Sequence, residues 1–220
     1  MLASSLVILA AALNLASASP VQKIVGSITC TNNDTAPLIV GNLISLGPSG
    51  IPRKASFQGA EDGQSRLELS TSIDGTPSPD YPQFAFRYCD SRTMPSAVGA
   101  VGDSNEVTYY GQLSPNGHRQ KCVAAETVGS SEPSPLISDA CYTIDDSGLI
   151  QQWWSFTTSD DGEPQSGTLN FIGHTNSTEE ETIFYGFTNT YDAASDAHLV
   201  ELVYSNQSQP NTGYTLSLQA

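Results

Sequence analysis

Lys and Arg are absent from this sequence after residue 121. All eight Lys and Arg lie at or before Lys121, whereas residues 122–220 hold fourteen Asp and Glu, and the whole chain has a formal net charge of −15. Phosphate backbones are bound by clustered Lys and Arg, so this charge distribution argues against nucleic acid as a partner. The excess of carboxylates is typical of a surface that keeps an extracellular protein in solution.

Long apolar runs are also missing, so we expect no membrane anchor in the mature chain. The apolar run of residues 6–15 is too short to cross a bilayer, and Ala16, Ser17 and Ala18 follow it as small residues of the kind that precede a signal-peptide cleavage site. We therefore expect residues 1–18 to be a signal peptide and the protein to be secreted.

Helical periodicity is scarce, and charged residues make up only 14% of the chain. Short apolar runs alternate instead with turn residues such as Gly, Pro, Ser, Thr and Asn, a pattern typical of β-rich secreted domains. The roughly 200 residues that remain are enough for one domain with a sizeable core. We predict a single all-β domain over residues 19–220.

The four cysteines are an even number in a secretory context, which predicts two disulfides. Three pairings are open. None of the spacings is C-x-x-C, so a zinc ribbon or a thioredoxin-like redox site has little support, and we expect no metal and no cofactor. Three sequons predict glycosylation on surface loops at Asn33, Asn176 and Asn206.

The pattern G-x-L-x-x-x-G occurs three times, at residues 41–47, 111–117 and 167–173. A short apolar-x-apolar strand begins 43, 41 and 47 residues after the first Gly of each copy, at Phe84, Gln152 and Tyr214. Two further strand-like runs, bounded by turn residues, lie between these landmarks in every copy. Each copy is therefore predicted to hold about four short strands.

Twelve strands in three copies resemble a β-trefoil, in which six strands close a barrel and six form hairpins that cap one end. The Gly would admit a turn or a close neighbouring strand, and the Leu would point into the core. We expect one apolar side chain per copy near the axis: Phe86, Trp154 and Leu216. The predicted repeats span about 37–90, 107–160 and 165–220. Another β-barrel or a β-sandwich is the alternative fold.

The middle copy reads GQLSPNGHRQKCV, then LISDAC, then QQWWSFTTSDDG, within residues 111–162. This order of a G-x-L strand, a Lys-Cys-apolar strand, a second Cys and a Gln-x-Trp strand resembles a ricin-type (QxW) lectin repeat. Gln152, Trp153 and Trp154 match Gln-x-Trp. The resemblance implies the disulfides Cys122–Cys141 and Cys30–Cys89. The first and third copies carry neither paired cysteines nor Gln-x-Trp.

The resemblance also implies where a galactose-like ring would bind. Lectins of this family use an Asp after the first Cys, an aromatic platform near the second and an amide beside Gln-x-Trp. Here those positions hold Ala124, Asp139 and Gln151, so the usual site is degraded. Trp153 lies on the opposite face of its strand from Trp154, which is expected in the core. We therefore predict Trp153, with Gln151 and Asp139, as the ligand contacts.

Nucleophile motifs such as G-x-S-x-G and H-E-x-x-H are absent, and the four cysteines are expected in disulfides. Asp145 with Asp146, and Asp160 with Asp161, are carboxylate pairs of the kind that glycosidases need, but their turn-like contexts favour solvated loops. His118 and His174 follow the second Gly of two copies and are expected in turns. We predict no catalysis.

The sequence thus predicts a secreted, non-catalytic binding protein whose partner is an extracellular glycan or protein, with carbohydrate first because of the resemblance. The alternative is a β-trefoil proteinase inhibitor, which would present one exposed loop to an enzyme. Basic side chains cluster in two segments that would serve as that loop: residues 47–55, with Arg53 and Lys54, and residues 115–121.

Overall fold

The structure is a computed structural model that describes residues 26–30, 37–58, 65–70, 83–100, 105–159, 164–176, 183–194, 196–206, 208 and 210–220. Within these residues the regular elements are β-strands and one short 3-10 helix, η1 (Ser147–Gln151). The prediction of an all-β chain is therefore confirmed. The expected signal peptide, the sequon at Asn33 and the pair Asp160 and Asp161 lie outside the described residues.

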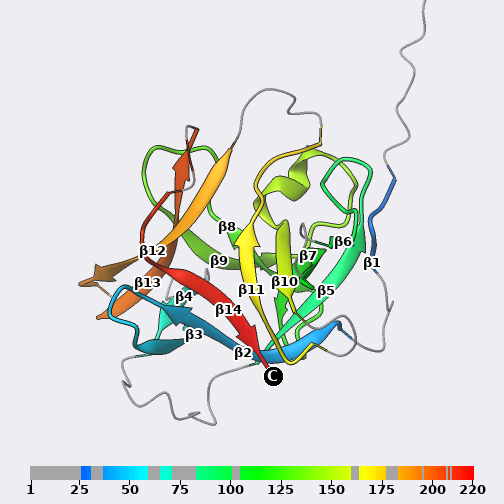
Figure 1. The fold of residues 1–220 in the computed structure, drawn as a ribbon. Helices are drawn as coiled ribbons and strands as arrows, with labels where there is room; N and C mark the ends of the chain where they lie inside the picture. Colours follow the sequence, from blue (N-terminus) through cyan, green and yellow to red (C-terminus); the bar gives the residue numbers. More distant parts are fainter. Residues whose placement is uncertain are drawn as a thin grey trace, which may run out of the picture.

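Six strands form a closed barrel, which Figure 1 shows with its strands side by side around a common core. Each strand pairs antiparallel with the next, and the last pairs with the first, so this sheet has no free edge. In order around the ring they are β2 (Ile39–Leu46), β5 (Phe84–Asp90), β7 (Val107–Pro115), β10 (Trp154–Thr158), β11 (Ser166–Phe171) and β14 (Thr215–Gln219).

Three hairpins lie outside the barrel, and each follows one barrel strand and precedes another. They are β3 (Pro52–Gln58) with β4 (Arg66–Leu69), β8 (Lys121–Ala125) with β9 (Ser134–Ala140), and β12 (Phe184–Asp192) with β13 (Ala197–Ser205). The strands β4, β9 and β13 also pair with one another, so the hairpins form one connected layer. Two short strands extend the barrel: β1 (Thr29–Cys30) on β5 and β6 (Gly99–Ala100) on β7.

The repeated Gly and Leu have the roles that the pattern predicts. Leu43, Leu113 and Leu169 are all buried in the main core. A Cβ atom on Gly111 would lie 1.9 Å from the carbonyl oxygen of Arg87, because the neighbouring strand passes directly over this position. A side chain there would force the two barrel strands apart.

The expected central residues Phe86, Trp154 and Leu216 are fully buried and belong to one core cluster. Their strand registers differ, however. The first Gly of each copy lies opposite Phe84, Trp154 and Leu218, respectively. Spacing along the chain missed the equivalence of Phe84 and Leu218 because the hydrogen-bond register, and not the distance in sequence, aligns the closing strand with the opening one.

The disulfides are Cys30–Cys89 and Cys122–Cys141, as the resemblance implied. The first bond ties β1 to β5, and the second joins β8 to the residue after β9. Cys122 and Cys141 are 19 residues apart. A loop of this size restricts the unfolded chain enough to stabilise the fold by about 3 kcal/mol on the chain-entropy model.

Candidate functional site

The structure buries Trp153, which was predicted to be an exposed ligand contact, and this prediction is wrong. Its side chain is 0% exposed and packs in a second core cluster with Cys89, Met94 and Leu149. Its indole Nε1 donates a hydrogen bond to the carbonyl oxygen of Pro95, 2.7 Å away. Trp153 and Trp154 pack in separate clusters, as strand alternation predicts. Both clusters are buried, so neither indole faces solvent.

The other two predicted ligand contacts, Asp139 and Gln151, are exposed. The carboxylate of Asp139 accepts a hydrogen bond from the backbone N–H of its neighbour Ala140. Because Trp153 is buried, it cannot provide an aromatic surface beside these two side chains for a sugar ring. The three predicted contacts therefore do not form one sugar site.

Gln152 and Trp154, the outer residues of Gln-x-Trp, connect this segment to the disulfide-linked hairpin. The buried Gln152 amide accepts a hydrogen bond from the N–H of Tyr142 and donates one to the carbonyl of Ala140, each 2.8 Å long, so it holds the backbone on both sides of Cys141. Trp154 Nε1 donates to the carbonyl of Val123, next to Cys122. The matched motif thus has a structural role in this chain.

The remaining candidates from the sequence are dispersed. His118 is exposed in the turn after β7, and His174 is half-buried after β11. The described part of the chain holds no group of three or more His, Cys, Asp or Glu side chains placed to bind a metal ion. Of the sequons, Asn176 and Asn206 are exposed, and the side chain of Asn176 donates a hydrogen bond to the carbonyl of Met94.

Asp145 and Asp146 point to different structural partners. Asp145 accepts hydrogen bonds from the Ser91 hydroxyl at 2.6 Å and from the N–H groups of Arg92 and Thr93 at 2.9 and 3.2 Å. Asp146 accepts from the N–H of Gly148, where it caps η1, and from the phenol of Tyr142. Neither carboxylate is held ready for a substrate, as a glycosidase pair would require.

The surroundings of Asp145 also change its pKa. Partial burial alone would raise the pKa of this carboxyl, but the hydrogen bonds from Ser91, Arg92 and Thr93 favour the charged form and hold the pKa below its usual value. The charged carboxylate therefore fastens the segment after β5 to the segment before η1.

One cavity combines an arginine, a histidine and a tyrosine, and we refer to it as the Arg53 cavity. Its volume is about 310 Å³, and its walls come from β2, β3 and their connection, the end of β4, the β12–β13 hairpin and the residue before β14. The lining residues are Ser45, Gly47, Pro48, Ser49, Ile51, Arg53, Leu69, Asn189, His198 and Tyr214. None of them carries a carboxylate.

Strand register brings several of these side chains together. Ser45 on β2 lies directly opposite Arg53 on β3, and Leu69 on β4 lies opposite His198 on β13. Ala55, two residues after Arg53 and on the same face of β3, pairs with Leu69. Cross-strand neighbours share a face, so Arg53 and His198 lie on one continuous surface although 145 positions separate their numbers.

Tyr214 forms an aromatic wall of the Arg53 cavity. A Cβ atom on Gly47 would lie 2.7 Å from its Cε1 atom, so the ring occupies space that only a glycine leaves open. The Tyr214 hydroxyl donates a hydrogen bond to Oδ1 of Asn189 at 3.3 Å, which leaves the amide nitrogen of Asn189 for another acceptor.

Arg53 and His198 carry polar groups that pair with no described residue. The half-buried Arg53 side chain has no hydrogen-bond or ion-pair partner among the described residues. Nδ1 of His198 is buried without a partner, and the ring packs 5.5 Å from that of Tyr191. His198 as a whole is half-buried and lines the cavity.

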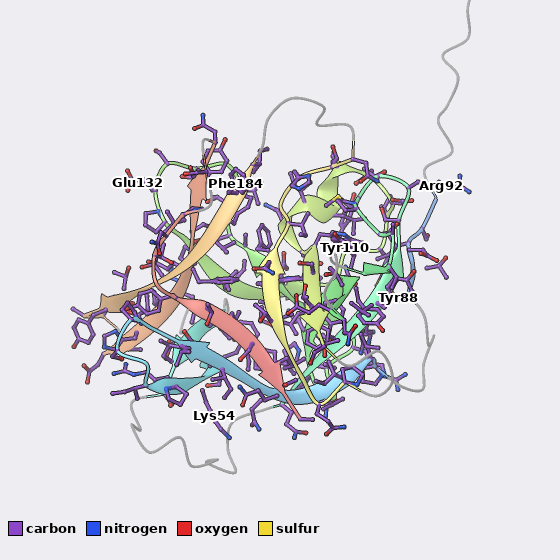
Figure 2. All side chains as sticks on the ribbon, viewed as in Figure 1. Lys54, Tyr88, Arg92, Tyr110, Glu132 and Phe184 are labelled. Atoms are coloured by element: carbon purple, nitrogen blue, oxygen red, sulfur yellow. A yellow bond between two sulfur atoms is a disulfide. The ribbon has the colours of Figure 1, made fainter. Side chains whose placement is uncertain are left out.

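A second cavity, which we call the Asp145 cavity, has a volume of about 630 Å³. It also contains an arginine, Arg92, but two carboxylates share it. The lining residues are Gly26, Ser27, Thr29, Asp90, Ser91, Arg92, Ser96 and Asp145. Figure 2 labels Arg92 near β1, far across the molecule from Lys54, the neighbour of Arg53 in β3.

The two basic segments differ in exposure. Arg53 and Lys54 belong to strand β3 and not to a loop, and Lys54 is buried with its Nζ bonded to Oδ1 of Asn42 at 3.0 Å. This strand does not display a basic pair, so the expectation of an exposed loop at this pair is wrong. Residues 116–120, by contrast, form an exposed turn next to Cys122, and Arg119 is part of it.

Comparison of the chain with protein-family models, curated proteins and solved structures found no match. Within the described ranges, no helix has the length and apolar character that crossing a bilayer requires.

Proposed function

We propose that this chain is a secreted, non-catalytic carbohydrate-binding protein with a β-trefoil fold related to the ricin-type lectins. Two features support the trefoil. Six strands close a barrel, and each third of the chain adds one hairpin to a common layer outside it. Two disulfides favour an oxidising, extracellular setting. Among the described residues, the adjacent carboxylates of Asp145 and Asp146 have separate structural partners, which favours a non-catalytic role for this pair.

The Arg53 cavity is the proposed binding site, and the observation that carries the proposal is its set of unpaired polar groups beside an aromatic ring. A sugar has hydroxyls that exchange hydrogen bonds and an apolar face that packs on an aromatic side chain. Asn189, His198 and Arg53 offer the polar contacts, and Tyr214 offers the ring. The site is assembled from the first and third copies, away from the degraded site of the middle copy.

A glycan array with the purified protein tests this proposal. We expect Tyr214→Ala to abolish the signal seen with the wild-type protein, because the variant removes the aromatic wall of the cavity. Tyr88→Ala is the matched control, since Tyr88 lies on β5 outside the cavity and is labelled in Figure 2. Absence of binding to every glycan, or equal loss in both variants, would contradict a carbohydrate site here.

A proteinase inhibitor of the trefoil type is the second candidate, and the exposed turn of residues 116–120 favours it. The backbone of this turn is fixed at its end, because the N–H of Cys141 bonds to the carbonyl of Gln120 and Cys141 is joined to Cys122. A basic, restrained loop is the form that a serine proteinase with a preference for Arg accepts. Trypsin inhibition that Arg119→Ala removes would support this function, whereas no inhibition would dismiss it.

A further inference from the structure

We propose that the Arg53 cavity selects sugars that carry a carboxylate, such as hexuronic acids, over neutral sugars. This inference rests on the proposed function and names the ligand class of the same site. The cavity volume of about 310 Å³ lies at the lower end of the range for small-molecule sites, which suits one sugar residue.

The charge of the lining carries the inference. The chain has 23 Asp and Glu against 8 Lys and Arg, yet the ten residues of this cavity include an arginine and no carboxylate. A guanidinium that is half-buried and has no partner among the described residues keeps its hydrogen-bonding capacity for a ligand. Because its planar fork matches a carboxylate in a bidentate geometry, a carboxylate is the group that it binds best.

The neighbours of Arg53 fit the rest of an acidic sugar. Ser45 lies opposite Arg53 and offers a hydroxyl beside the guanidinium. Tyr214 and Ile51 provide apolar surface for the ring face, while the amide of Asn189 and the imidazole of His198 are the polar groups that line the cavity beside it. The Asp145 cavity lacks this selectivity, because Asp90 and Asp145 would repel an anion beside Arg92.

Calorimetric titration with methyl β-glucuronide and methyl β-glucoside tests the inference, since the two ligands differ only at the carbon that carries the carboxylate. We expect the wild-type protein to bind the glucuronide at least tenfold more tightly, as charged hydrogen bonds contribute that much or more. Arg53→Gln should reduce the ratio to about one, because the loss of the guanidinium weakens binding of the glucuronide much more than binding of the glucoside. Arg92→Gln removes the same charged group elsewhere and should leave the ratio unchanged.

The outcomes separate this inference from the proposed function. Equal affinities of the wild-type protein for the two glycosides, with binding that Tyr214→Ala removes, would overturn the carboxylate preference and leave the sugar site standing. A preference that Arg92→Gln removes and Arg53→Gln keeps would overturn the assignment to this cavity. Failure of both glycosides to bind at the highest concentration tested would overturn the inference together with the proposed site.

Discussion

The two cavities contain the same charged group in opposite surroundings. In the Asp145 cavity, Arg92 shares the site with two carboxylates, and the side chains of Ser91, Ser96 and Asp145 bond to one another or to the backbone. In the Arg53 cavity, no carboxylate lines the wall, and Arg53 and His198 are left without protein partners among the described residues. A cavity whose polar groups are satisfied stabilises the fold, whereas one whose polar groups are unpaired is available to a ligand.

The Asp145 cavity, although larger, is therefore the weaker candidate for a ligand site. Its wall of residues 91–96 is held by the Asp145 carboxylate on one side and by the indole of Trp153 on the other. If the Asp145 region is structural and the Arg53 cavity is functional, substitutions in the first should mainly lower stability and substitutions in the second should mainly lower ligand affinity.

Trp153→Ala should have the largest effect, a loss of about 3–5 kcal/mol in the free energy of unfolding, because it removes a fully buried indole and its hydrogen bond to Pro95. Urea denaturation followed by fluorescence or circular dichroism measures this loss. Tyr214→Ala, at a half-buried position, serves as the comparison and should cost clearly less. A loss below about 1 kcal/mol for Trp153→Ala would mean that Trp153 is not a core residue.

Asp145→Ala should lower the free energy of unfolding by about 2 kcal/mol, since the Ser91 hydroxyl and two backbone N–H groups lose a charged acceptor. Asp90→Asn is the control, because Asp90 is an exposed acidic residue of the same cavity. We expect its effect to stay within about 0.5 kcal/mol. Similar losses in the two variants would show that the hydrogen bonds of Asp145 do not contribute this stability.

The same carboxylate predicts a pH dependence. The hydrogen bonds hold the folded pKa of Asp145 below its unfolded value of about 3.9, so its contribution is fully present above that pH. The contribution is lost as the pH falls through the folded pKa. In urea titrations from pH 6 downward, the stability gap between wild type and Asp145→Ala should therefore shrink below about pH 4. A gap that is constant down to pH 2 would contradict the depressed pKa.

Gly47→Ala should disturb the Arg53 cavity more than the fold. The added methyl group would lie 2.7 Å from the Tyr214 ring, so the ring has to move, at a cost of about 1 kcal/mol. Ligand affinity, measured by titration with the glycan found on the array, should fall at least tenfold. Gly50→Ala, in the same turn but with no atom within 4 Å of the new Cβ, controls for the loss of a glycine; its positive φ adds only backbone strain. Equal affinities in the two variants would contradict a binding role for Tyr214.

Arg53→Gln should have the smallest effect on the free energy of unfolding, within about 0.5 kcal/mol, because the guanidinium has no described partner to leave unpaired. The thermal midpoint measured by calorimetry should therefore stay close to that of the wild type. A loss above about 1 kcal/mol would mean that Arg53 stabilises the fold and is not reserved for a ligand.

Local sequence patterns predicted the barrel well, because they report on interactions between neighbouring strands. The G-x-L pattern located three strands whose Leu residues enter the core, and the Gln-x-Trp match located the segment beside Cys122–Cys141. The register of the closing strands was missed, since Phe84 and Leu218 are aligned by hydrogen bonds across the sheet. Alternation placed Trp153 and Trp154 in separate clusters, but the expected exposure of Trp153 was wrong, because Met94 and Cys89 cover it from more than fifty residues away.

Neither cavity was predicted from the sequence. The Arg53 cavity is built from residues near positions 45–53, 69, 189–198 and 214, and no sequence motif connects these separate segments. Its assembly depends on the pairing of β4 with β13 and on the contact of Tyr214 with Gly47, and both are long-range features. A glycine at position 47 was visible in the repeat, but nothing in the pattern indicated which ring it accommodates.

Chemical-shift mapping by NMR gives the most direct test of the claim that the Arg53 cavity is the ligand site. On titration with methyl β-glucuronide, we expect the largest backbone shifts to cluster at Ser45, Asn189 and Tyr214, which line this cavity. The residues of the Asp145 cavity, such as Ser27 and Arg92, should keep their shifts. Shifts that cluster at Ser27 and Arg92, or on neither cavity, would contradict it.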